Sequence, residues 1–203
     1  MTVQWKPLAL TPAMVRLIGN IDEFKGRWDT LSALPPGQLD LIRREAVLEA
    51  SAATSRLEGR PVDPDLIASL MAQPTEHGGD PRVGAMASAY GRTLDTVHAL
   101  YRELEPTRHN VLELQRLLCM GTKIENPSPT SEVLSDLDAL LMDLQTELAE
   151  PSNHPLISIP LFNLRLLSLH PFPTGNGRLA RILTTLLMLR SGYGSAACAS
   201  LEV

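Results

Sequence analysis

Apolar residues recur along this chain three or four positions apart, the spacing that places them on one face of a helix. The clearest repeat, in residues 82–105, runs through Met86, Tyr90, Leu94, Val97, Leu100 and Tyr101. A near-heptad series of leucines fills residues 130–149. No stretch alternates apolar and polar residues for long enough to form a strand. The pattern therefore predicts an all-α protein, a compact orthogonal bundle of helices.

Stretches rich in proline and glycine separate the apolar repeats and mark the helix boundaries. We expect helices over residues 11–31, 38–58, 63–72, 82–105, 109–121, 130–149 and 157–169, and a last helix that ends near residue 191. In the first helix, five apolar side chains share one face: Val15, Ile18, Ile21, Phe24 and Trp28. Gly59 is placed to end the second helix in a left-handed conformation, and Pro61 prevents its continuation.

The loop at residues 74–81 contains two prolines and two adjacent glycines and is the clearest break in the chain. It divides the chain into an N-terminal helical segment, residues 1–73, and a main domain, residues 82–203.

Composition suits an ordinary globular domain, because the 203 residues are 44% hydrophobic and carry a formal charge of −5. An acidic chain without a basic face is not expected to bind nucleic acid. The first ten residues lack the features of a signal peptide, and the apolar run at residues 182–189 is too short to span a membrane. We therefore expect a cytoplasmic protein with no membrane partner.

One stretch concentrates the polar chemistry, residues 170–181, which read His-Pro-Phe-Pro-Thr-Gly-Asn-Gly-Arg-Leu-Ala-Arg directly before the run 182–189. That run is typical of a buried helix, so the stretch covers the start of the helix, where unpaired backbone N–H groups favour an anion. Arg178 and Arg181 are three residues apart and share a helix face. The arrangement suits a polyphosphate. The alternative is a proline- and glycine-rich turn before a solvated basic helix.

Individual residues of this stretch have distinct expected roles. His170 is a natural general base because its reference pKa lies near working pH, although a histidine before proline can equally be structural. Phe172, between two prolines, is expected to turn inward and pin the loop to the core. Gly175, Asn176 and Gly177 can form a nest of N–H groups for phosphate oxygens, with the Asn176 amide as a further donor.

The same stretch closely resembles the signature of the Fic (Fido-domain) family, His-Pro-Phe-x-(Asp/Glu)-Gly-Asn-Gly-Arg-x-x-Arg. Eight of its nine fixed positions are met, and Thr174 is the exception because it stands at the acidic position. The resemblance implies a Fic-type orthogonal helical bundle and the transfer of AMP from ATP to a hydroxyl of a target protein. In that reaction His170 would deprotonate the hydroxyl as it attacks the α-phosphorus.

The resemblance also implies how the nucleotide is bound. Gly175, Asn176 and Gly177 would hold the α- and β-phosphates. Arg178 would pair with the β-phosphate, and Arg181 with the γ-phosphate. Mg²⁺ would bridge the α- and β-phosphates, but Thr174 offers a neutral hydroxyl where the family has a carboxylate, which weakens the expected metal site.

A second match lies upstream, where residues 54–59, Thr-Ser-Arg-Leu-Glu-Gly, resemble the inhibitory motif (Ser/Thr)-x-x-x-Glu-(Gly/Asn) of one class of Fic proteins. By this resemblance Glu58 would pair with Arg181, displace the γ-phosphate and keep the enzyme autoinhibited. The alternative is a solvated glutamate that ends a helix before a glycine cap.

The residues between two predicted helices, 122–129, are too few for the β-hairpin flap that docks the target in most Fic proteins, so we expect a reduced flap. Three hypotheses follow: an adenylyltransferase inhibited by Glu58, an enzyme that removes AMP with a water positioned by Glu58, and a nucleotide-binding regulatory module that has lost catalysis. The target protein is not identified by the sequence, and a homodimer remains an open alternative.

Overall fold

The computed structural model of the protein describes residues 9–31, 36–72, 81–122 and 129–202. Throughout these residues the chain forms helices and loops and contains no strand, so the predicted all-α class is confirmed. The helices are α1 (Pro12–Leu31), α2 (Pro36–Leu57), α3 (Pro64–Ala72), α4 (Pro81–Leu100), α5 (Arg108–Cys119), α6 (Ser131–Ala149), α7 (Pro155–Leu169), α8 (Asn176–Arg190) and the 3₁₀ helix η1 (Gly194–Ala197). The predicted domain break at 74–80 and most of the predicted short flap, 123–128, lie outside the described residues.

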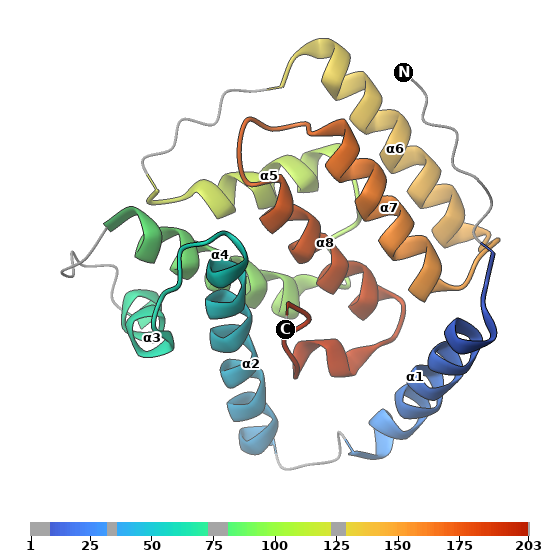
Figure 1. Ribbon diagram of the computed structural model, residues 1–203, viewed down its shortest axis with the longest axis horizontal. Helices are drawn as coiled ribbons and strands as arrows, with labels where there is room; N and C mark the ends of the chain where they lie inside the picture. The colour runs from blue at the N-terminus through green and yellow to red at the C-terminus, as the bar shows by residue number, and fades with distance from the viewer. Residues whose placement is uncertain (1–8, 32–35, 73–80, 123–128, 203) are drawn as a thin grey trace.

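Helix α8 is the central element of the fold. Figure 1 shows it in the middle of the molecule, with α7 on one side and α4 and α5 on the other. Its buried side chains lie on every side of the helix, from Leu179 and Ile182 to Leu186 and Leu187, as expected of a helix enclosed by the core. The stretch that carries the predicted chemistry therefore leads into the most enclosed helix of the protein.

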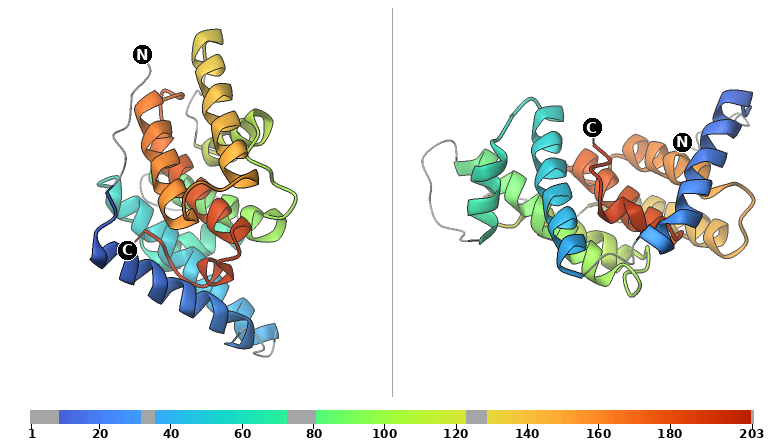
Figure 2. Two further views of the ribbon diagram at one scale, coloured as in Figure 1. Left: turned by 90° about the vertical axis from the view of Figure 1, so that its right-hand side faces the viewer. Right: turned by 90° about the horizontal axis from the view of Figure 1, so that it is seen from below.

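The remaining helices form two groups around α8. On one side α6 packs against α7 through the leucines of its near-heptad repeat, of which Leu137, Leu140, Leu141 and Leu144 are buried. On the other side α2 and α3 pack against α4 (Figures 1 and 2). As a result the C-terminal end of α2 reaches the start of α8. No helix in the described ranges is long and apolar enough to cross a lipid bilayer.

Helix α1 forms as predicted, and its apolar face is only partly covered. Val15, Ile21 and Phe24, which share that face, are exposed, and α1 lies at the edge of the molecule against the C-terminal segment (Figure 2). Polar contacts attach it there: Asp22 accepts a hydrogen bond of 2.7 Å from the hydroxyl of Tyr193. Helical spacing shows which side chains share a face, but it does not show that another element covers that face.

Helix α4 ends at Leu100, before the predicted end at residue 105. Arg190 of α8 donates hydrogen bonds to the carbonyl oxygens of Tyr101, Arg102 and Leu104 at 3.0, 3.0 and 3.2 Å. These carbonyls lie in the turn beyond α4, so a distant arginine stabilises the early end of the helix.

Candidate functional site

His170 stands where α7 ends and the polar loop begins. Its backbone has φ 50° and ψ 55°, the only left-handed conformation of a non-glycine residue in the described part of the chain. Such a conformation is unfavourable for a side chain with a Cβ atom and is often found at functional positions. It turns the chain sharply at the start of the loop, where His170 is exposed.

The loop after His170 is closed by the side chain of Asn176. The Asn176 Oδ1 accepts a hydrogen bond of 3.1 Å from the N–H of Phe172, and its Nδ2 donates one of 2.6 Å to the Phe172 carbonyl. Phe172 is buried in the core, as predicted. The Asn176 side chain is also buried, and it holds the loop through both of its polar atoms. Its role as a phosphate donor stays a prediction.

Gly175 precedes the first turn of α8 with φ +82° and provides no side-chain cap. The backbone angle favours glycine, and a Cβ atom at this position would crowd two side chains, at 3.1 Å from Gln115 Nε2 and 3.3 Å from Arg178 Nη2. The first N–H groups of α8, which include those of Asn176 and Gly177, have no acceptor within the helix. They give the loop its capacity to bind an anion.

The two arginines of α8 lie at different depths. The guanidinium of Arg178 is buried, and its Nη1 lies 3.4 Å from the carbonyl oxygen of Leu118, to which it donates. Arg181 is partly exposed, and its Nε donates a hydrogen bond of 2.9 Å to Thr54 Oγ1 of α2. The helix spacing thus places both cations toward the end of α2.

Glu58 completes this cluster from the C-terminal end of α2. Gly59, at φ +71°, donates to the Arg56 carbonyl and Arg60 donates to the Ser55 carbonyl, a Schellman motif that confirms the predicted cap and fixes the backbone of Glu58.

One oxygen of Glu58 contacts both arginines. Its Oε1 lies 3.2 Å from Arg181 Nη2, to which it is hydrogen-bonded, and 3.3 Å from Arg178 Nε. The Arg178 Nε atom makes no aligned hydrogen bond, so the second contact is an ion pair only. The structure therefore places Glu58 against Arg181, as the sequence suggested, and against Arg178 in addition. Two guanidiniums converge on the position of one anionic oxygen.

Tyr90 of α4 is a buried residue near this cluster, and its place in an apolar repeat suggested only a core role. Its hydroxyl donates a hydrogen bond to the carboxylate of Glu202. Burial and the neighbouring Glu202 raise the pKa of Tyr90 well above its ordinary value, so the phenol stays protonated.

The position expected to hold a metal contains no anionic group. The Thr174 carbonyl accepts a hydrogen bond of 2.8 Å from Gln115, and the nearby carboxylate of Glu58 is engaged by arginines. Among the described residues, no three His, Cys, Asp or Glu side chains gather as metal ligands. Because Mg²⁺ prefers anionic oxygen, the side chains of this loop do not fit a magnesium ion held by the protein.

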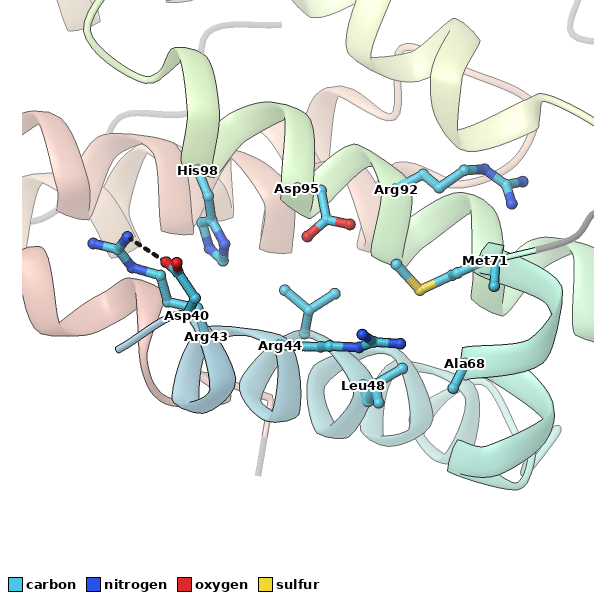
Figure 3. Close-up of a pocket in the computed structure, with 11 residues that line it drawn as sticks. Asp40, Arg43, Arg44, Leu48, Ala68, Met71, Arg92, Asp95 and His98 are labelled. Carbon is cyan, nitrogen blue, oxygen red and sulfur yellow. Dashed lines mark ion pairs between the residues drawn. The ribbon is translucent and has the colours of Figure 1, made fainter. Parts of the chain in front are cut away.

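A separate groove of about 410 Å³ lies between α2, α3 and α4 (Figure 3). It is lined by Asp40, Arg43, Arg44, Val47, Leu48, Ala68, Met71, Ala72, Arg92, Asp95 and His98, and by none of the loop residues. Burial, assisted by Arg43, lowers the pKa of His98 to about 4, and burial raises the pKa of Asp95. The groove is therefore separate from the candidate site at residues 170–181.

Over the described residues the protein is all-helical, and its central helix begins in a glycine-containing turn that follows an exposed histidine. The profile of the Fic/DOC family matches residues 29–188. The chain belongs to the Fic/DOC family.

Sequence relatives and solved structures agree with this assignment. The chain is 37% identical over 67 residues to protein adenylyltransferase fic-1 of Caenorhabditis briggsae, and 37% identical over 68 residues to fic-1 of Caenorhabditis elegans. These alignments cover 33% and 34% of this chain but only 12% and 13% of those proteins.

The fold is similar to that of a Fic family protein from Desulfovibrio desulfuricans, with a TM-score of 0.72, 22% identity, and coverage of 98% of this chain and 64% of that one. A Fic domain containing signaling protein from Bacteroides thetaiotaomicron gives a TM-score of 0.70 at 21% identity, covering 85% of this chain and 74% of that one.

Proposed function

We propose that the protein transfers AMP from ATP to a hydroxyl side chain of a target protein and that Glu58 inhibits this reaction. The observation that carries the proposal is the single Glu58 oxygen between Arg178 and Arg181 at the start of α8. The position suits an oxygen of a terminal phosphate, because a guanidinium binds phosphate and carboxylate in the same way. The relatives named protein adenylyltransferase support the same class of reaction.

In the proposed complex the triphosphate replaces Glu58. An oxygen of the γ-phosphate takes the place of the carboxylate oxygen beside Arg181, and the buried Arg178 faces the β-phosphate. The α- and β-phosphates lie along the backbone N–H groups of Gly175, Asn176 and Gly177. Glu58 and the nucleotide cannot occupy the site together, since their negative charges would meet at one position.

His170 is the proposed general base. Its exposed imidazole accepts the proton of the target hydroxyl while the hydroxyl oxygen bonds to the α-phosphorus. The bond from the α-phosphorus to the bridging oxygen breaks, and pyrophosphate leaves. The guanidiniums and the backbone N–H groups stabilise the negative charge of the leaving pyrophosphate. Because Thr174 supplies no carboxylate, any Mg²⁺ that accompanies ATP depends on the phosphate oxygens and water.

The replacement His170→Ala tests this assignment. Transfer of labelled AMP should fall by a factor on the order of 10²–10⁴, while ATP affinity stays unchanged because the imidazole acts on the incoming hydroxyl. His109→Ala, which removes an exposed histidine from α5, is the matched control and should transfer AMP at the parent rate. Transfer at the parent rate by the His170 variant would exclude His170 as the base.

A nucleotide-binding regulatory module is the second candidate function. It is favoured by Thr174, since the loop retains its anion-binding groups but lacks the anionic metal ligand of the family signature. ATP binding by a Glu58 variant that never labels itself or a protein would favour this candidate.

A further inference from the structure

Gln115 of α5 lies directly beneath the loop that leads into α8. Its side chain is fully buried, and its Nε2 donates a hydrogen bond of 2.8 Å to the carbonyl oxygen of Thr174, 59 positions later in the sequence. The same amide packs against Gly175, where a Cβ atom would lie 3.1 Å from Nε2 and 3.5 Å from Oε1. Gln115 therefore fixes the peptide that joins Thr174 to Gly175.

The geometry of a trans peptide turns this contact into an orientation of the loop. The carbonyl of Thr174 and the N–H of Gly175 belong to one planar unit and point in opposite directions. No cis peptide occurs in the described residues. Because Gln115 of α5 holds the carbonyl, the N–H of Gly175 points to the opposite side, away from α5.

The other amide in the loop, on Asn176, acts at a different place. It holds the N–H and carbonyl of Phe172 and so fixes the beginning of the turn. Gly175 has φ +82° and, having no Cβ atom, few steric constraints of its own on the orientation of its peptide. The hydrogen bond from Gln115 therefore sets the orientation of the Thr174–Gly175 peptide.

Stability alone does not explain a glutamine at this position. Its Oε1 is buried without a hydrogen-bond partner, and an unpaired buried acceptor is unfavourable. What the side chain contributes is its N–H donor. We infer that Gln115 is a positioning residue that orients the Gly175 N–H toward a phosphate of the bound nucleotide, an inference that rests on the proposed function.

The test compares ATP affinity in full-length variants that also carry Glu58→Gly, so that the site is open. Gln115→Glu keeps the volume of the side chain but replaces the donor with an acceptor, and Gln115→Leu removes the amide. Gln145→Leu is the matched control, because Gln145 donates a hydrogen bond of 3.1 Å to the Pro106 carbonyl away from the site. Calorimetry should show about tenfold weaker ATP binding for both Gln115 variants. The Gln145 control should bind ATP as tightly as the Glu58→Gly protein.

A second measurement does not depend on nucleotide. In ¹H–¹⁵N spectra of the unliganded variants, the Gly175 amide resonance should shift with Gln115→Glu and Gln115→Leu and stay in place with Gln145→Leu. If one Gln115 variant fails to fold, the other still provides both measurements.

The outcomes separate the two ideas. ATP binding to the Glu58→Gly protein that is equally tight in the Gln115 variants, or an unshifted Gly175 resonance, overturns the role of Gln115. Failure of Glu58→Gly itself to bind ATP counts against the proposed function, and the Gly175 resonance then decides the role of Gln115 alone.

Discussion

Replacing Glu58 should open the anion site, and the structure sets the size of the effect. The carboxylate oxygen lies 3.2 Å from Arg181 Nη2 and 3.3 Å from Arg178 Nε, and these side chains are 23% and 2% exposed. ATP must break both contacts before its phosphates reach the guanidiniums. A hydrogen bond to a charged group contributes about 1.5–3 kcal/mol, and the 29% exposure of Glu58 places this pair toward the lower value. Glu58→Gly should therefore tighten ATP binding roughly tenfold or more.

The same change should reduce the stability of the unliganded protein. Arg178 would keep its buried charge and lose its anionic neighbour, which costs up to about 3 kcal/mol when one partner of a buried pair is removed. ATP should restore that loss by supplying a phosphate. A lower melting temperature that rises steeply with added ATP is thus expected of the variant, and a smaller rise is expected of the parent.

Two further variants make the assay specific. Glu58→Gln removes the charge but keeps the residue's size and its place at the helix end, and it should reproduce most of the gain. Glu49→Gln removes the carboxylate of another α2 ion pair, with Arg56 at 2.8 Å, and should leave ATP affinity unchanged. Calorimetry with ATP and self-labelling with labelled ATP measure binding and transfer separately. If neither Glu58 variant binds ATP more tightly than the Glu49 variant, the inhibitory role of Glu58 is wrong.

The other predictions concern the metal position and the pH dependence of stability. Thr174→Glu should add the anionic oxygen that Mg²⁺ prefers and tighten ATP binding several-fold in Mg²⁺ but not with a chelator; lower Mg²⁺ affinity would contradict this. The pKa of His98 is lowered from 6.5 to about 4, so between these pH values the unfolded chain binds the proton that the folded chain lacks. Stability should therefore fall by up to about 3 kcal/mol as pH decreases from about 6.5 to about 4. Urea unfolding of His98→Asn should show a weaker pH dependence in that range, and an unchanged slope would assign the effect to other groups.

Local signals allowed much of the fold to be predicted. Caps such as Gly59, and helical repeats such as the leucines of α6, depend on residues a few positions apart, so the sequence shows them directly. The position of α1 depended instead on the C-terminal segment, where Tyr193 meets Asp22 from 171 positions away. No local pattern contains that information, so the spacing of the apolar residues shows which of them share a face of α1 but not what that face meets.

The candidate site likewise has features that neighbouring residues determine and features that only the fold determines. The turn at Gly175 and the shared helix face of Arg178 and Arg181 follow from contiguous residues, so their placement could be predicted. Even within this stretch, donor groups alone did not reveal that the Asn176 amide is used to close the loop, because its partner is a backbone unit that only the folded turn brings near.

The supporting residues could not be found from the sequence because their role exists only across the fold. Thr54 accepts from Arg181 over 127 positions, and Gln115 reaches Thr174 over 59. Tyr90 was hidden in an apolar repeat, where a phenol is counted for its ring and not for its hydroxyl. Arginines and glycines in a short polar stretch are an unusual combination, so a candidate phosphate site of this kind is recognisable in the sequence. A residue that orients another needs only one donor at the right point in space, so its type is common and its position alone gives it a function.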